Sequence, residues 1–221
     1  MKDYKVFDII GPVMIGPSSS HTAGACRIAK VARNIAGKGF NEVEFVLHGS
    51  FAETYKGHGT DRALLAGAMG FQPDDKRLRS AFEIADAEGL EYSYRREDLG
   101  KVHSNSAKII MKYPDGHEFS VIGSSIGGGN IVIVEINGVP VTYTDEFPTL
   151  LVKYDEQTGV ISYISTLLSD NNYNIESIRT IKSNDEVTCI VETTEDVDDH
   201  IIDEIVNNPR FKFAKYITSE E

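Results

Sequence analysis

Three consecutive serines and a histidine stand directly before the first helical pattern of the chain. They are Ser18, Ser19, Ser20 and His21, followed by Thr22. Hydroxyls and free backbone N–H groups at the positive end of a helix dipole suit a carboxylate or a phosphate. The same dipole disfavours a protonated His21, so a neutral imidazole could take a proton or donate a hydrogen bond. An ordinary helix start with Ser19 or Ser20 as N-cap is the competing interpretation of these residues, and the motif alone leaves both open.

A second histidine lies between two glycines, in Gly57-His58-Gly59. These glycines permit a close backbone approach to a ligand or a positive φ, so we expect His58 to be exposed in a loop. Thr60 or Asp61 would then cap the next helix. Because histidine titrates near neutral pH, His58 is a natural general base if substrate lies beside it. A solvated histidine next to a helix cap is the alternative interpretation.

Two further segments carry weaker signals. His103 opens a polar turn that ordinary turn chemistry explains as well as function does. Gly127, Gly128 and Gly129 stand between two predicted strands, where successive backbone N–H groups could cradle an anion. A bulge or a wide turn is the competing explanation for these glycines.

Composition narrows the class of protein. The chain has 221 residues and a formal net charge of −12, which argues against a nucleic-acid binder or attachment to an anionic membrane. No run of apolar residues is long enough to span a membrane, and the start does not resemble a secretory signal. Cys26 and Cys189 are far apart and form no CxxC pair, so we expect core thiols and no metal site in this chain. A reducing, cytoplasmic compartment follows as the default.

The elements that must position these residues fall into two parts. We place the boundary near residue 146, in a linker that contains Pro148, giving domains 1–146 and 147–221. The second part is a regular succession of strand-like and helix-like segments. Their order is βαββαβ, the ferredoxin-like arrangement. Its strands are expected at 149–154, 175–181, 187–192 and 211–217, with helices at 160–168 and from 198 to about 206.

The first part is a less regular α/β region, so the whole chain is predicted to be α+β. Helices are expected at 23–35, 61–69 and 77–87, and strands at 43–47, 107–113, 118–123, 130–136 and 139–143. Asp115-Gly116 and Asn137-Gly138 predict hairpin turns. The order of the strands in this part does not follow from the pattern.

Three motifs occur together in one order: Gly16 to Thr22, Gly49 to Asp61, and Ser125 to Gly129, followed by the βαββαβ tail. This combination closely resembles the β chain of the bacterial iron–sulfur-dependent L-serine dehydratases over essentially the whole chain. The resemblance implies a serine-dehydratase β domain, also known as an allosteric substrate-binding domain, followed by an ACT domain.

The resemblance implies a lyase reaction of amino-acid degradation, in which L-serine loses water and then yields pyruvate and ammonia. In that family a 4Fe–4S cluster binds the serine hydroxyl as a Lewis acid. Its ligands are cysteines of an α chain, so this chain would be one subunit of a cytoplasmic hetero-oligomer. The two unclustered cysteines of the sequence agree with that division.

Matching the family's motifs also assigns roles to residues. Ser18, Ser19 and Ser20 should hold the substrate carboxylate at the helix start. His58 is expected to be the α-proton base, and His21 to orient substrate or relay a proton. We further expect four more residues to contribute to substrate binding: Thr22, His103, Gly127 and Gly128. His103 is also a third, weaker candidate for acid–base work.

The tail departs from the usual ACT pattern in one loop. Amino-acid-binding ACT domains commonly carry Asp-x-x-Gly, whereas here Gly159 comes one position later after Asp155. Serine as an effector and dimerisation through the ACT sheet therefore both remain open. Three other functions compete for the whole chain: a non-catalytic amino-acid-sensing regulatory subunit, a phosphate-binding or hydrolytic enzyme acting alone, and a scaffold for an α chain.

Overall fold

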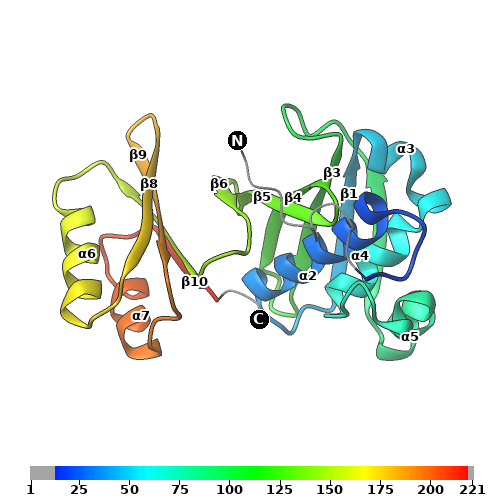
Figure 1. The fold of residues 1–221 in the computed structure, drawn as a ribbon, viewed down its shortest axis with the longest axis horizontal. Helices are drawn as coiled ribbons and strands as arrows, with labels where there is room; N and C mark the ends of the chain where they lie inside the picture. Colours follow the sequence, from blue (N-terminus) through cyan, green and yellow to red (C-terminus); the bar gives the residue numbers. More distant parts are fainter. Residues whose placement is uncertain (1–12, 219–221) are drawn as a thin grey trace. The chain divides into compact units, whose positions relative to one another are not determined.

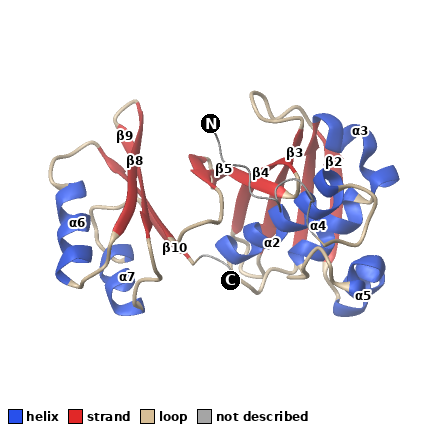
Figure 2. Cartoon of the chain, in the orientation of Figure 1, coloured by secondary structure: helices blue, strands red, loops and turns tan. Residues whose placement is uncertain are grey.

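The computed structural model describes residues 13–218 and mixes helices with two β-sheets, as the α+β prediction requires (Figures 1 and 2). The chain divides into two compact units after Gly138. The assignment of the domain boundary to residue 146 stays a prediction. None of the helices in residues 13–218 has the length and apolar character needed to cross a bilayer.

The first unit opens with a π-helical turn, η1, that runs directly into the helix α2. Its elements up to the end of its last strand are η1 Ser19–Gly24, α2 Ala25–Ala36, β1 Glu42–His48, α3 Gly49–His58, α4 Thr60–Ala68, η2 Lys76–Ser80, α5 Ala81–Glu88, β2 Glu91–Arg96, β3 Asn105–Lys112, β4 Glu118–Gly127 and β5 Asn130–Ile136. The predicted strands and the helix at 23–35 are therefore confirmed within a few residues. The turn predicted at Asn137-Gly138 leads into β6, Val139–Tyr143.

The first sheet has the order β2-β1-β3-β4-β5-β6. β1 and β2 are parallel, whereas β1–β3, β3–β4 and β4–β5 are antiparallel. Helices α2 and α4 cover one face of this sheet (Figure 1). Glycine permits the close packing: a Cβ on Gly123 would lie 2.5 Å from Ile28 of α2, and one on Gly67 of α4 would lie 2.1 Å from the Cys26 carbonyl oxygen.

Three details of the first unit differ from the sequence prediction. Residues 49–58 form the helix α3, although two glycines and a weak apolar stripe give little local signal for one. The polar segment Glu91–Arg96 is the edge strand β2, which was not predicted. The helix expected at 77–87 is divided into the 3₁₀ turn η2 and the helix α5.

The second unit confirms the predicted order βαββαβ. Its elements after the linker are β7 Thr149–Asp155, α6 Val160–Asp170, β8 Ile175–Ser183, β9 Glu186–Thr193, α7 Asp199–Val206 and β10 Phe213–Ile217. The sheet order is β10-β7-β9-β8, and every pair is antiparallel. Both helices lie on one face of the sheet (Figure 2), where Ile164 and Ile201 meet the inward side chains of β7 and β9 in one apolar core.

Candidate active site

The η1 turn determines where the serine motif and His21 lie. Ser18 has an extended backbone, and its Oγ accepts a hydrogen bond from the His21 N–H at 3.2 Å. Ser18 is thus the N-cap, and the interpretation that places the cap at Ser19 or Ser20 is wrong. The turn that follows is a π-helix. This conformation is rare in proteins as a whole, and where it occurs it is often at a functional site.

The imidazole of His21 is held between two serine hydroxyls. Its Nε2 lies 3.0 Å from Ser50 Oγ, and its Nδ1 lies 3.5 Å from Ser18 Oγ. The ring also meets the ring of Phe51 edge-on, with 5.3 Å between centroids. Burial, and secondarily the charge of His58, lowers the pKa of His21 below its usual range. The neutral His21 that the sequence predicted therefore agrees with the structure, although burial is the leading cause.

The second histidine lies beside the first. The rings of His21 and His58 meet at 73°, with 4.8 Å between their centroids. The Thr22 hydroxyl donates to the His58 carbonyl oxygen at 3.2 Å, which ties the η1 turn to the end of α3. The structure thus brings together two histidines that are 37 residues apart in the sequence and belong to different motifs.

His58 is exposed, as predicted, but it is not in a loop. It is the last residue of α3, and Gly59 ends that helix in the left-handed region with a φ of 69°. Gly57 is an ordinary helical residue, so Gly59 alone uses the conformational freedom that the sequence suggested for both. Gly59 is also the N-cap of α4, and neither Thr60 nor Asp61 caps that helix through its side chain.

The polar turn that contains His103 packs against the start of α3. Gly49 pairs with Asn105 in an isolated bridge, and a Cβ on Gly49 would lie 2.6 Å from the Ser104 carbonyl oxygen. His103 itself is exposed, and its Nδ1 accepts the Asn105 N–H at 3.1 Å. Within residues 13–218 no hydrogen bond or ring contact joins His103 to His21 or His58.

The glycine run forms the end of the β4–β5 hairpin. Gly127 pairs with Asn130, the register shifts between Ser125 and Gly127, and Gly127, Gly128 and Gly129 all have positive φ. The structure therefore shows the bulge and turn that the sequence left as an alternative. Arg27 of α2 donates to the Gly129 carbonyl oxygen at 3.0 Å, which fixes this hairpin to the helix that follows η1. Substrate binding by Gly127 and Gly128 stays a prediction.

Two residues at the site were absent from the predicted set. Ser50, in the first turn of α3, contacts His21, and Ser125, near the end of β4, has a fully buried hydroxyl without a hydrogen-bond partner. A Cβ on Gly24 would lie only 2.1 Å from Ser125 Oγ, so Ser125 packs against the junction of η1 and α2. Both serines stand inside the recognisable motifs, but only the folded chain shows what they contact.

A pocket of about 360 Å³ opens beside His58. Thr22, His58 and Gly59 line it together with the guanidinium-bearing Arg62 and Arg79. Among residues 13–218, no carboxylate side chain lines this pocket, although the chain as a whole carries a net charge of −12. Its volume accommodates a small metabolite, and its lining favours an anionic group on that metabolite.

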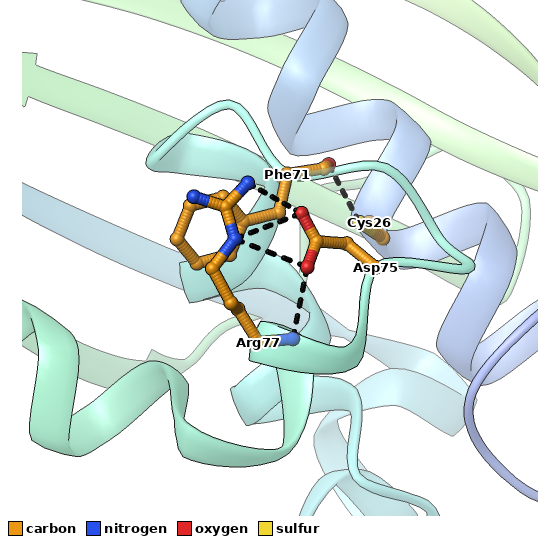
Figure 3. A network of polar contacts seen from close by, with 4 residues as sticks. All are labelled: Cys26, Phe71, Asp75 and Arg77. Carbon is orange, nitrogen blue, oxygen red and sulfur yellow. Dashed lines mark hydrogen bonds and ion pairs between the residues drawn. The ribbon is translucent and has the colours of Figure 1, made fainter.

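The cysteines do not fit the ligand set of an iron–sulfur cluster. Both are buried; Cys26 donates from Sγ to the Phe71 carbonyl oxygen at 3.3 Å, and burial raises the pKa of Cys189 to about 11. Figure 3 shows the surroundings of Cys26. There Arg77 lies over the Phe71 ring, and two of its guanidinium nitrogens donate hydrogen bonds to the Asp75 carboxylate. In the described part of the chain, no three His, Cys, Asp or Glu side chains gather as a metal site would require.

Known protein families match both units of the chain. The pattern of the family described as "Serine dehydratase beta chain" matches residues 5–135, which include the serine motif, both histidines and the glycine hairpin. The chain belongs to the serine dehydratase beta chain family. The ACT domain pattern matches residues 149–210, which contain most of the βαββαβ unit. The family and domain resemblance found in the sequence is confirmed.

Two relatives of this serine dehydratase beta chain family member align along nearly its whole length, and a third aligns along most of it. It is 51% identical to the "L-serine dehydratase, beta chain" of Peptoniphilus asaccharolyticus, with 98% of this chain and 99% of the relative covered. It is 42% identical to the "Probable L-serine dehydratase, beta chain" of Bacillus subtilis, with 95% and 96% covered. It is 30% identical to "L-serine dehydratase 2" of Escherichia coli, where 78% of this chain covers 44% of the relative.

Proposed function

We propose that this chain is the β subunit of an L-serine dehydratase, which converts L-serine to pyruvate and ammonia together with an α chain. The observation that carries the proposal is the contact between His21 of the η1 turn and His58 at the end of α3, with 4.8 Å between ring centroids. The pair lies in a chain that aligns end to end with relatives named as β chains of this enzyme.

In this proposal His58 removes the α-proton of the substrate. Its ring is exposed at the wall of the pocket, so a substrate can reach it without rearrangement of the chain. His21 is neutral and half-buried beside it, which suits a ring that orients the substrate or passes a proton on.

The substrate carboxylate is assigned to the serine motif at the helix start. Ser18 Oγ already accepts the His21 N–H, and the Thr22 hydroxyl already donates to the His58 carbonyl oxygen. Ser19 and Ser20 make no side-chain hydrogen bond within residues 13–218, so their hydroxyls are the ones available to a ligand. Ser18 and Thr22 then shape the site, and the guanidinium groups of Arg62 and Arg79 add positive charge to the adjoining pocket.

The 4Fe–4S cluster implied by the family is assigned to the partner α chain. The buried, separated cysteines of this chain support that assignment. We further propose a cytoplasmic hetero-oligomer. Dimerisation through the ACT sheet and binding of L-serine there as an effector stay predictions. Asp155 at the end of β7 and Glu156 in the loop that follows are paired with Lys212 and Lys182, respectively.

The test is an anaerobic pull-down of the tagged chain from its native extract, with immediate assay of pyruvate formed from L-serine. Iron and sulfide are quantified in the same sample. A second, cysteine-bearing chain with iron, sulfide and air-sensitive activity supports the proposal. Recovery of the chain alone, without iron but binding L-serine, would instead favour the amino-acid-sensing subunit and remove the roles given to the histidines.

The carboxylate site has its own test in the assembled enzyme. Ser19→Ala should raise KM for L-serine about 10- to 150-fold, because one hydrogen bond to a charged group contributes roughly 1.5–3 kcal/mol. Wild-type KM and turnover in this variant would show that the carboxylate binds elsewhere.

A further inference from the structure

The shortest side-chain contact of His21 is with Ser50, a residue to which the proposed function gives no part. Ser50 Oγ lies 3.0 Å from Nε2, whereas Ser18 Oγ lies 3.5 Å from Nδ1. Since the donor and acceptor atoms of a hydrogen bond to nitrogen usually lie about 2.7–3.2 Å apart, the contact with Ser50 is the stronger constraint on the ring.

A single helix carries both Ser50 and His58. They stand near the two ends of α3, Gly49–His58, and the spacing of eight residues is two full turns plus about 80°, which leaves both on the same side of that helix. Ser50 touches the His21 ring through its hydroxyl, and His58 meets the same ring edge-on. The helix therefore fixes the second histidine directly and the first through Ser50.

The position of Ser50 is itself fixed by its neighbour. Gly49 has a φ of 53°, and a Cβ there would lie 2.6 Å from the Ser104 carbonyl oxygen, so the start of α3 lies directly on the 103–106 turn. Phe51 on the other side is fully buried and packs against the His21 ring. A hydroxyl at position 50 thus has little freedom to move away from Nε2.

We propose that Ser50 is a positioning residue for the reaction, whose hydroxyl holds the His21 imidazole in the orientation in which it meets His58. The inference rests on the proposed function, because it takes the two histidines to be the acid–base pair. Burial and His58 lower the pKa of His21, which keeps the ring neutral with one donor and one acceptor nitrogen. The Ser50 contact settles which way those two nitrogens face.

Activity of the assembled enzyme gives the first test. Ser50→Ala should lower kcat by about 10- to 100-fold, the loss typical of a displaced catalytic group, and leave KM for L-serine within about twofold. Ser50→Thr keeps the hydroxyl and should recover most of kcat. Thr54→Val is the matched control: Thr54 lies one turn along α3, its hydroxyl donates to the Ser50 carbonyl oxygen, and its loss should leave kcat near the wild-type value.

The second test does not depend on activity. Imidazole ¹⁵N spectra of the full chain should show the His21 Nε2 resonance move in Ser50→Ala, return in Ser50→Thr and stay in place in Thr54→Val. If Ser50→Ala fails to fold, Ser50→Cys keeps the side-chain volume with a weaker hydrogen bond, and both kcat and the resonance should change in the same sense.

Three results would overturn the inference. An unchanged His21 resonance in Ser50→Ala would show that the contact is not made. A raised KM with unchanged kcat would make Ser50 a substrate ligand, and loss of kcat in Thr54→Val equal to that in Ser50→Ala would show a general role of the α3 fold. If the wild-type assembly does not turn over L-serine, the proposed function fails while the spectra still decide whether Ser50 positions His21.

Discussion

The two units of the chain differ in the hydroxyl groups that they bury. In the first unit, two fully buried hydroxyls, Thr60 Oγ1 and Ser125 Oγ, have no hydrogen-bond partner in the described structure. In the second unit, the buried residues Thr149 and Thr193 donate from Oγ1 to the carbonyl oxygens of Phe147 at 3.0 Å and Glu195 at 2.8 Å, respectively.

The contrast shows what a site requires beyond a fold. An apolar core under a sheet and buried hydroxyls that have hydrogen-bond partners suffice for the second unit. The first unit leaves polar groups buried without partners, and each such group costs roughly 1–3 kcal/mol. Local departures of this kind are expected where a protein binds or reacts with a ligand.

The largest expected effect separates the histidines of the two units. His58→Ala in the assembled enzyme should lower kcat by about 10²- to 10⁴-fold, the usual contribution of a general base. His200→Ala is the matched control, since His200 is an exposed histidine near the start of α7 in the second unit. Steady-state kinetics with L-serine measures both, and iron content confirms that the assembly is intact. Wild-type turnover in His58→Ala would remove it from the reaction.

An effect of intermediate size on the free energy of unfolding should distinguish a glycine with no room for a Cβ from one with open space around it. Gly24→Ala should cost about 2–3 kcal/mol, because its Cβ would lie 2.1 Å from Ser125 Oγ. Gly159→Ala in the second unit should cost about 1 kcal/mol from its φ of 83°, since a Cβ there meets nothing within 4 Å. Denaturant unfolding compares them. Adding Ser125→Gly to Gly24→Ala should recover part of the loss, and simple additivity would contradict the crowding explanation.

The smallest expected effect is a dependence of stability on pH that belongs to the first unit. The folded pKa of His21 lies below the ordinary value of 6.5, so the unfolded chain binds more protons as the pH falls through that value. Stability from this group is therefore present above about pH 6.5 and is lost on acidification. Tm measured from about pH 7.5 to about pH 5.5 should fall less in His21→Gln than in the wild type. Equal losses would show that His21 does not contribute.

Local pattern and tertiary packing contributed unequally to what could be predicted. In β7 and β9, short runs of apolar and β-branched residues predict the strands directly, and Val152 and Val191 of these runs lie in one core. In α3, Gly49 and Gly57 lower the intrinsic helix propensity, so the helix depends on burial of Phe51 and on the contact of Gly49 with the 103–106 turn. The π-helical form of η1 likewise has no period that a sequence displays.

The sequence by itself determined the family, the α+β class, the βαββαβ tail and the types of residue that carry the chemistry, because motifs and periodicity are local properties of the chain. Only the tertiary structure decided that His21 meets His58, that Ser50 contacts the His21 ring, and that the glycine run is a hairpin end. Those contacts join residues far apart in sequence, and their distances follow from how α2, α3 and β4 pack.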